Sequence, residues 1–387
     1  MVERIQNGDR SVGYVTSRHE YDGRNGTLID LGLGTSPIGP APELRIPLRE
    51  RDPFYDLSQY SEDPLHTDTR KLVIERLGLR GLEDECVVFD ANGSYGAGDE
   101  VVRYLHLTGY NTLIVPNYSF PNVAQWTERH GVKYSTLDTE HLNPNSSLQT
   151  VLSLGASALE DTIVYVDYPN NPFGLADPIL VRQIVDHVTQ NEGIPIVDLA
   201  FGEVLGEEFG NAIQYTVDKG GICLASLSKT QGFPRARAGY AILPPKLTRN
   251  GYDGSQRMVF ELAGESEFIC QQLFSPDSNG GYLAKTHAQR VASYNVATNN
   301  QFYSGLCGLG LEVKPTDLRT PIQVVVSDLS NLNQRLIIEG VVTESLYDYR
   351  VTLGNGLHGY DHSAVRMLTP RPGELEEVLR RVELALK

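Results

Sequence analysis

The stretch SLSKTQGFPRARAGY, residues Ser226–Tyr240, directly follows the apolar run Ile222–Ala225. This run is predicted to form a buried strand, so Lys229 lies just beyond a strand end. A buried ammonium group is costly to remove from water, whereas a desolvated lysine amine can be held as a Schiff base with a carbonyl cofactor. Taken alone, the stretch is equally compatible with a surface lysine at a strand end. The rest of the chain decides between the two interpretations.

From residue 86 onward, short apolar runs alternate with segments of helical spacing. The runs predicted to be strands are 86–89, 112–115, 132–135, 162–166, 194–197, 222–225 and 239–243. The segments predicted to be helices between them are 99–107, 123–130 and 179–189. This alternation predicts an α/β fold with a mostly parallel seven-stranded sheet that is covered on both faces. Ligands of such sheets bind beyond the carboxyl ends of the strands.

The composition changes after Pro245, where a smaller α+β domain is predicted. Its elements are a long helix over 281–305, a strand over 322–326, a helix over 329–339, a strand over 365–368 and a final amphipathic helix. Residues 1–50 are polar and then Gly/Pro-rich, which is typical of an extended arm. The predicted organisation is therefore an arm over 1–50, a large domain over 51–280 and a small domain over 281–387.

Polar residues follow three of the predicted strands. Asp167–Gly174 reads DYPNNPFG, Asp198 ends the next strand, and Lys229 follows the third. The glycine-rich stretch Asn92–Gly98, NGSYGAG, opens a predicted helix, whose free amides and dipole suit a phosphate. Pyridoxal phosphate needs a phosphate cradle, a carboxylate on its ring nitrogen, a donor to its phenolate oxygen and a lysine for its aldehyde. The pattern predicts a pyridoxal-phosphate site at one edge of the sheet.

Each of these residues has a simpler role when it is taken singly. Asp198 suits a helix N-cap, and Asn170 and Asn171 before a proline suit a turn. Arg366 is compatible with a structural ion pair, and a glycine-rich loop alone is common. The order and spacing of the whole set favour the cofactor site.

In that order, the motifs resemble those of the class I/II pyridoxal-phosphate-dependent aminotransferases, which share the aspartate-aminotransferase fold. The histidinol-phosphate aminotransferase branch is the most similar, and the resemblance spans residues 28–387. It implies that Lys229 forms the Schiff base and that Ser226 and Arg237 bind the cofactor phosphate. It also implies that Asn171 lies at the phenolate oxygen and that Asp198 keeps the pyridine nitrogen protonated.

The same resemblance implies roles for residues outside these strand ends. Those residues are Ser94 and Tyr95 in the phosphate cradle, Tyr118 stacked on the cofactor ring, Arg366 on the substrate carboxylate, and Gly34 in an arm segment that closes over the substrate. Tyr60 is implied to reach the phosphate of the partner subunit. The enzyme is therefore expected to be a homodimer in which the arm packs on the small domain and on the partner.

Two positions depart from the family pattern. Phe201 stands where a tyrosine of the family donates to the phenolate oxygen, so that hydrogen bond is lost and the Schiff base should keep its proton to higher pH. Glu344, in GVVTE, stands where histidinol-phosphate enzymes carry an arginine that binds the substrate phosphate. We therefore expect a neutral or cationic amino acid as substrate, unless Arg350 restores an anion site. A solvent-exposed Glu344 with no role is the alternative.

The resemblance implies an aminotransferase of amino-acid metabolism and biosynthesis, acting on small amino acids and 2-oxo acids. Lys229 would serve as the base that moves the proton released from the substrate Cα, with Asp198 and Tyr118 supporting the ring. A decarboxylase or lyase of the same fold, similar to threonine-phosphate decarboxylases, stays open as the alternative. A transcription regulator with an aminotransferase-like domain is disfavoured, because it would carry an added basic domain.

Composition narrows the class of partner. The chain has 387 residues and a net charge of −16, which argues against nucleic-acid and anionic-membrane surfaces. No apolar run is of membrane-spanning length, the N-terminus lacks the apolar core of a signal peptide, and no metal-binding pattern occurs. The four cysteines form no CxxC pair and are expected to be free, buried thiols, which suits a cytoplasmic protein.

Overall fold

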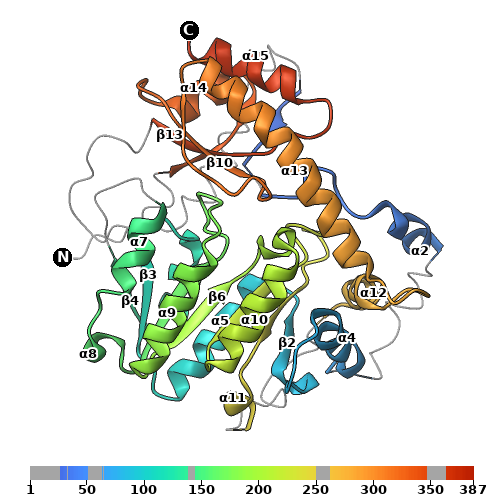
Figure 1. The fold of residues 1–387 in the computed structure, drawn as a ribbon, viewed down its shortest axis with the longest axis vertical. Coiled ribbons are helices and arrows are strands. Elements are labelled where there is room, and N and C mark those ends of the chain that lie inside the picture. The colour runs from blue at the N-terminus through green and yellow to red at the C-terminus, as the bar shows by residue number, and fades with distance from the viewer. Residues whose placement is uncertain are drawn as a thin grey trace.

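The computed structural model describes residues 27–32, 34–50, 63, 65–137, 144–249, 262–346 and 363–387. Two sheets lie one above the other in the view of Figure 1, and the long helix α13 (Leu283–Gly308) runs alongside both of them. The larger sheet is built from residues 87–242, and the smaller sheet from residues 312–368.

The larger sheet has seven strands, and six of them point the same way. In the order in which they pair, they are β2 (Val87–Asp90), β8 (Gly239–Ile242), β7 (Ile222–Ser226), β6 (Ile194–Asp198), β5 (Thr162–Asp167), β3 (Thr112–Pro116) and β4 (Lys133–Leu137). Strand β8 alone is antiparallel to its neighbours. The predicted α/β fold with a mostly parallel seven-stranded sheet is confirmed.

Helices cover both faces of this sheet, as Figure 1 shows. On one face lie α4 (Thr67–Leu77), α7 (Pro144–Val151), α9 (Pro178–Gln190), α10 (Glu207–Asp218) and α12 (Gly264–Phe274). On the other lie α5 (Gly93–Leu107) and α6 (Ala124–His130). Along β5, Val164 and Val166 face the first set, whereas Ile163 and Tyr165 face the second. This two-sided burial explains why the strands are continuous apolar runs.

Helix α5 begins at Gly93, six residues earlier than predicted, so most of the glycine-rich stretch is helical rather than a loop. Close packing is the reason for two of its glycines. A Cβ on Gly96 would lie 1.9 Å from Asp90 Oδ1, and one on Gly98 would lie 2.4 Å from Trp126 Cη2. Glycine is required at these two positions because a side chain would not fit, and not because the backbone conformation is unusual.

Helices α10 and α12 lie in segments where no helix was predicted. In α10 the buried residues Phe209, Ile213, Thr216 and Val217 recur at intervals of three and four, a spacing that would have identified the helix. Three further short helices of this part of the chain are α2 (Arg45–Glu50), α8 (Ala156–Leu159) and α11 (Pro245–Arg249).

The smaller sheet is antiparallel and has four strands. In pairing order they are β12 (Glu344–Ser345), β13 (Ala364–Leu368), β10 (Ile322–Val326) and β9 (Glu312–Val313). The C-terminal part of α13, α14 (Leu332–Ile338) and α15 (Leu375–Ala385) share a core with it. Strand β1 (Ile29–Asp30) pairs in parallel with β11 (Val341–Val342), so an N-terminal segment is part of the C-terminal structure.

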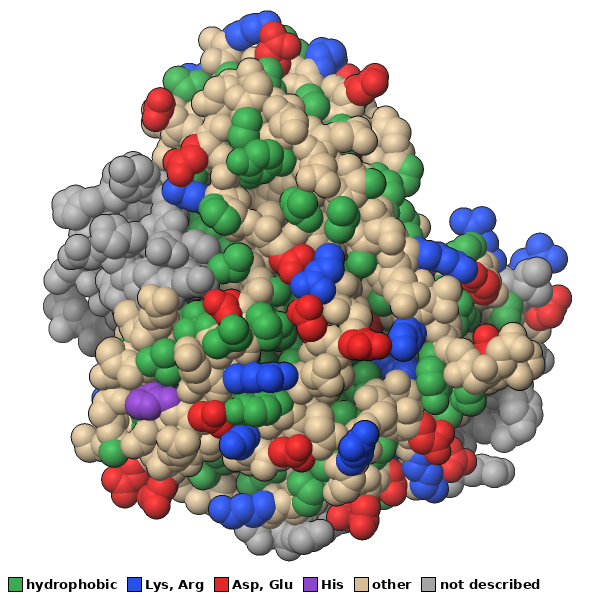
Figure 2. All heavy atoms as spheres, viewed as in Figure 1, with side chains coloured by type: hydrophobic (Ala, Val, Ile, Leu, Met, Phe, Trp, Pro, Cys, Tyr) green, Lys and Arg blue, Asp and Glu red, His purple; other side chains and the backbone are tan. Residues whose placement is uncertain are grey.

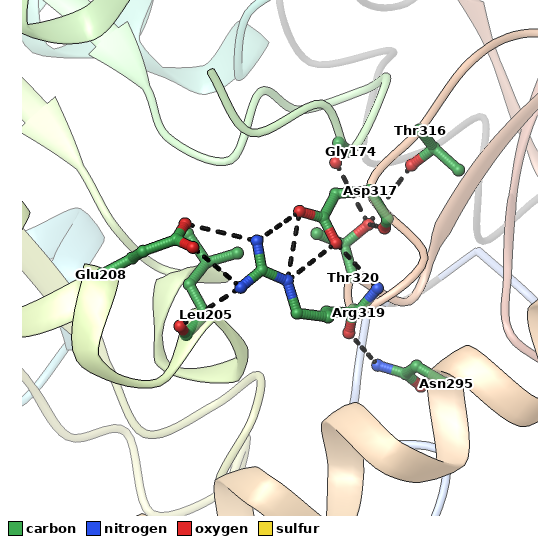
Figure 3. A network of polar contacts seen from close by, with 8 residues as sticks. All are labelled: Gly174, Leu205, Glu208, Asn295, Thr316, Asp317, Arg319 and Thr320. Carbon is green, nitrogen blue, oxygen red and sulfur yellow. Dashed lines mark hydrogen bonds and ion pairs between the residues drawn. The ribbon is translucent and has the colours of Figure 1, made fainter. Parts of the chain in front are cut away.

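A network of polar contacts joins the two sheets near the loop that follows β5 (Figure 3). Arg319 contacts Asp317 at 2.6 Å and Glu208 of α10 at 3.1 Å. Thr320 donates to the carbonyl of Gly174 at 3.3 Å. A Cβ on Gly174 would lie 2.5 Å from Thr316 Oγ1, so the loop that follows β5 and the segment that precedes β10 approach each other closely at Gly174. The loop that contains Asn171 is thereby tied to the smaller sheet.

Acidic and basic side chains are interspersed over the face that Figure 2 shows. Within the described ranges, no helix is both long and apolar enough to cross a membrane. Cys86, Cys223 and Cys270 are buried free thiols, as predicted, whereas Cys307 is exposed on α13.

Candidate active site

The residues singled out at strand ends meet over one cavity. Strands β5, β6 and β7 are parallel neighbours, and Asp167 pairs in register with Asp198. Lys229 follows three residues after the end of β7. The cavity has a volume of about 400 Å³. The described residues that line it are Asn92, Gly93, Ser94, Tyr95, Phe120, Asn122, Gln125, Asp167, Pro169, Asn171, Asp198, Ala200, Phe201, Ser226, Ser228, Lys229, Arg237, Glu344 and Arg366.

One end of the cavity is suited to an anion. The N-terminus of α5 brings Gly93, Ser94 and Tyr95 to the wall, and a helix N-terminus carries partial positive charge. Arg237 lies beside it and donates from Nη2 to the Asn92 carbonyl at 2.7 Å. A Cβ on Gly239 would lie 2.1 Å from the backbone nitrogen of Ser94, so β8 touches this helix terminus.

Two serines at the carboxyl end of β7 lie at the same end of the cavity: Ser226 is the last residue of the strand, and Ser228 follows it. The Ser228 backbone N–H donates to Ser226 Oγ at 3.1 Å, and both side chains line the cavity. Tyr95 points its hydroxyl to Gln125 Oε1 at 2.8 Å. Because the Tyr95 hydroxyl already has this partner, the group of Tyr95 that is left to bind an anion is its backbone N–H in the first turn of α5.

Asp198 also lines the cavity and is only 8% exposed. Its Oδ1 accepts the Ala200 N–H at 2.9 Å, and its Oδ2 accepts the hydroxyl of Tyr165 at 2.6 Å. These bonds hold the carboxylate in one orientation. A buried carboxylate of this kind suits a protonated ring nitrogen.

Lys229 lines the same cavity. Its Nζ lies 5.3 Å from the centroid of the Phe201 ring. Burial, and next the nearby guanidinium of Arg366, lower the pKa of Lys229 from its usual 10.5 to about 8. A larger fraction of the amine is therefore neutral near physiological pH, which favours nucleophilic attack and proton abstraction.

Gly34 lies beside two residues of the cavity wall, Lys229 and Phe201. Its φ is +59°, and a Cβ on it would lie 3.1 Å from Lys229 Nζ and 3.1 Å from Phe201 Cζ. The left-handed backbone and the close approach both require glycine at this position.

Arg366 is buried in β13 and connects three parts of the chain. It donates from Nη1 to Asn171 Oδ1 at 2.8 Å and from Nη2 to the carbonyl of Gly32. Glu344 stands opposite it in β12, with Oε2 at 2.8 Å from Arg366 Nη2. Glu344 therefore lines the cavity as the ion-pair partner of Arg366, and the alternative of a role-free exposed position does not hold.

The structure differs from the sequence-based expectation at Tyr118. The ring of Tyr118 is buried against Phe173, at 5.5 Å between centroids, and is not part of the cavity lining. The backbone of Tyr118 has φ +59°, and the ring joins an apolar cluster with Val324 and Leu346. Phe120, two residues later, lines the cavity instead.

Several residues of the site were not named as candidates from the sequence. Among them, Phe120, Asn122, Gln125, Asp167 and Ala200 line the cavity. Tyr165 contacts Asp167 at 2.8 Å. Tyr165 is two residues before Asp167 on a buried strand, so a polar pair on one face was a usable signal. Tyr60 and Arg350 lie outside the described residues.

The family model for class I and II aminotransferases matches residues 27–305. The chain belongs to this aminotransferase family. The histidinol-phosphate aminotransferase of Nitratidesulfovibrio vulgaris Hildenborough is 22% identical over 85% of each chain. That of Mycobacterium sp. KMS is 24% identical over 93% of this chain and 96% of its own length.

The fold agrees with solved aminotransferases. The histidinol-phosphate aminotransferase of Sinorhizobium meliloti in complex with pyridoxal-5′-phosphate superimposes with a TM-score of 0.72 at 18% identity, covering 100% of this chain and 99% of that one. The predicted family, the aminotransferase activity and the pyridoxal-phosphate cofactor are confirmed. Nothing in the comparisons favours the decarboxylase or lyase alternative.

Proposed function

We propose that this aminotransferase binds pyridoxal phosphate in the cavity between β5, β6, β7 and the N-terminus of α5. The observation that carries the proposal is the meeting of Asp198, Lys229 and an anion site around one cavity. When bound, the cofactor supplies an aldehyde that reacts with amines and a protonated ring that accepts electrons from the substrate. In this arrangement Lys229 holds the cofactor through Nζ and afterwards moves the proton at the substrate Cα.

The other side chains hold and orient the cofactor. Arg237, Ser226 and the first turn of α5 with Ser94 and Tyr95 bind the phosphate, since they combine a cation, hydroxyls and free amides. Asp198 pairs with the ring nitrogen. Phe120 takes the place at the ring face that the family resemblance assigned to Tyr118, because Phe120 lines the cavity and Tyr118 does not.

Asn171 and Phe201 line the cavity together with Lys229. Asn171 Oδ1 accepts from Arg366, so its amide nitrogen is the atom that donates to the phenolate oxygen. Phe201 has no donor, so it contributes apolar contact and desolvation around Nζ. One donor fewer at the phenolate raises the pH at which the bound Lys229 nitrogen loses its proton.

Arg366 binds the α-carboxylate of the substrate, with Gly34 closing over it. The guanidinium is buried, held by Asn171 and the Gly32 carbonyl, and shares the cavity with Lys229. A planar fork that is fixed in this way suits a carboxylate. Because Glu344 already pairs with Arg366, the incoming carboxylate competes with Glu344 for the same guanidinium.

The charge of Glu344 favours a neutral or cationic substrate over a phosphorylated one. Its carboxylate lies in the cavity at 2.8 Å from Arg366, where a substrate phosphate would meet a like charge. Like charges in a closed site disfavour the wrong substrate. Relatives named as histidinol-phosphate aminotransferases are below 30% identity and so do not decide the substrate.

The enzyme acts as a cytoplasmic homodimer in this proposal, with an arm over 1–50, a large domain over 51–280 and a small domain over 281–387. The family resemblance supports the dimer, in which Tyr60 donates to the partner's cofactor phosphate. Pairing of β1 with β11 supports an arm that packs on the small domain.

The decisive experiment is to map the lysine that carries the cofactor. Protein loaded with pyridoxal phosphate, reduced with borohydride and digested should yield the adduct on Lys229. Lys229→Ala should lose turnover by several orders of magnitude, since both the anchor and the base are removed. Lys219→Ala, which removes a surface lysine paired with Asp186, is the control and should retain activity. An adduct on another lysine, or an active Lys229→Ala variant, would contradict the proposal.

A further inference from the structure

The hydroxyl of Tyr165 lies between two buried carboxyl groups beside the cofactor cavity. Its oxygen is 2.8 Å from Asp167 Oδ1 and 2.6 Å from Asp198 Oδ2. Asp167 and Asp198 are register partners on β5 and β6, so their side chains leave the sheet side by side. All three side chains are less than 9% exposed.

The number of protons follows from these two contacts. Each oxygen–oxygen distance is that of a hydrogen bond, and each hydrogen bond needs a proton between the two oxygens. A tyrosine hydroxyl has only one proton to donate. The second contact therefore requires a proton on a carboxyl group, either Asp167 or Asp198. Two buried carboxylates that share a site rarely both ionise.

The surroundings assign this second proton to Asp167. Both carboxyl groups accept a backbone N–H, Asp198 from Ala200 at 2.9 Å and Asp167 from Phe120 at 3.0 Å, so this contact does not distinguish them. The positive charge of Lys229, which lines the same cavity, favours the ionised form of Asp198. The 2.6 Å contact to Asp198 has the length of a hydroxyl bound to an anion, whereas 2.8 Å is usual between neutral groups. Burial, and next the charge of Asp198, raise the pKa of Asp167 well above its usual range.

We propose that Asp167 and Tyr165 are positioning residues for Asp198: protonated Asp167 donates to Tyr165, and Tyr165 donates to Asp198. The chain of donors keeps Asp198 ionised and holds its carboxylate toward the ring nitrogen of the cofactor. The proton on Asp167 also reduces the total charge of the buried Asp167 and Asp198 side chains from −2 to −1. Hydrogen bonds in such a chain strengthen one another. The inference rests on the role proposed above for Asp198.

Infrared difference spectroscopy tests the proton directly on the full chain, without cofactor or turnover. The native-minus-Asp167→Asn spectrum should show the carbonyl band of a protonated carboxyl group. Asp186→Asn is the matched control, because Tyr215 donates to Asp186 at 2.7 Å in a solvent-accessible position; its spectrum should show carboxylate bands. Carboxylate bands in the Asp167→Asn difference spectrum would overturn the inference, even if the cofactor proposal holds.

The dissociation constant of pyridoxal phosphate, measured by fluorescence, tests the connection to Asp198. Asp167→Asn retains a donor to Tyr165, so its dissociation constant should stay within about twofold of native. Tyr165→Phe keeps the ring packed on Trp126, with 5.9 Å between centroids, but loses the hydroxyl. It should bind roughly tenfold more weakly, the effect of one charge-assisted hydrogen bond. If pyridoxal phosphate bound equally weakly to Asp167→Asn and to Tyr165→Phe, Asp167 would act through a negative charge, and the inference would be overturned.

Discussion

Replacing Glu344 should change the charge of the substrate that the enzyme accepts. In the native protein, Glu344 Oε2 lies 2.8 Å from Arg366 Nη2 and lines the cavity next to Lys229. Glu344→Gln removes the negative charge while it keeps the shape of the side chain. Glu344→Arg places a cation where an anionic group of the substrate would lie.

The size of the effect follows from Coulomb repulsion. Two unit charges about 5 Å apart repel by roughly 3 kcal/mol at an effective dielectric constant of about 20. Glu344 is 27% exposed, so solvent screens part of this repulsion. A net penalty of about 1–2 kcal/mol remains, which corresponds to about 5- to 30-fold in kcat/KM.

The assay compares kcat/KM for histidinol phosphate with kcat/KM for neutral and basic amino acids. Native enzyme should prefer the amino acids, Glu344→Gln should narrow the difference, and Glu344→Arg should reverse its direction. Glu312→Gln is the control. Glu312 lies on β9 of the same sheet, forms an ion pair with Lys314 and is 61% exposed. Efficient use of histidinol phosphate by the native enzyme would refute the reasoning. An unchanged preference in Glu344→Arg would exclude this position from substrate selection.

Three further predictions concern the amine, the dimer and the packing of α5. The lowered pKa of Lys229, about 8, makes the neutral and reactive amine dominant above that pH, so the rate of cofactor attachment should rise with pH with a midpoint near 8; a midpoint near 10.5 would contradict this. Tyr60→Phe should weaken cofactor binding in the dimer by about 2- to 10-fold, as expected for one hydrogen bond; unchanged affinity would exclude Tyr60 from the phosphate site. Gly98→Ala places a Cβ 2.4 Å from Trp126 and should lower the free energy of unfolding by about 1–3 kcal/mol in denaturant titrations. Gly155→Ala, with no atom within 4 Å of its Cβ, is the control, and equal effects of the two changes would contradict the packing argument.

The sequence by itself was sufficient to predict the sheet and most of the cavity. Apolar runs that alternate with helical segments predict parallel strands, and parallel strands bring their carboxyl ends to one edge. Asp198 directly follows one such run and Lys229 lies four residues beyond another, so their meeting depends on the order of the strands. The motif order along the chain likewise predicted the aminotransferase family.

Local patterns were less informative where packing decides the conformation. The glycines of NGSYGAG suggested a loop up to residue 98, whereas the helix begins at Gly93. Gly96 and Gly98 are required by Asp90 and Trp126, and neither contact is visible in the sequence around them. The choice between Tyr118 and Phe120 at the cavity wall depended on the cluster of Val324 and Leu346 that buries Tyr118.

Only the tertiary structure decided the charges of the site. Glu344 and Arg366 face each other because β12 and β13 pair in antiparallel register, and Tyr165 joins Asp167 to Asp198 because β5 lies beside β6. Distances of 2.6–2.8 Å between these groups determine where protons and charges lie. Residue spacing along a chain specifies which elements form, but the energy of a buried charge depends on its neighbours in space.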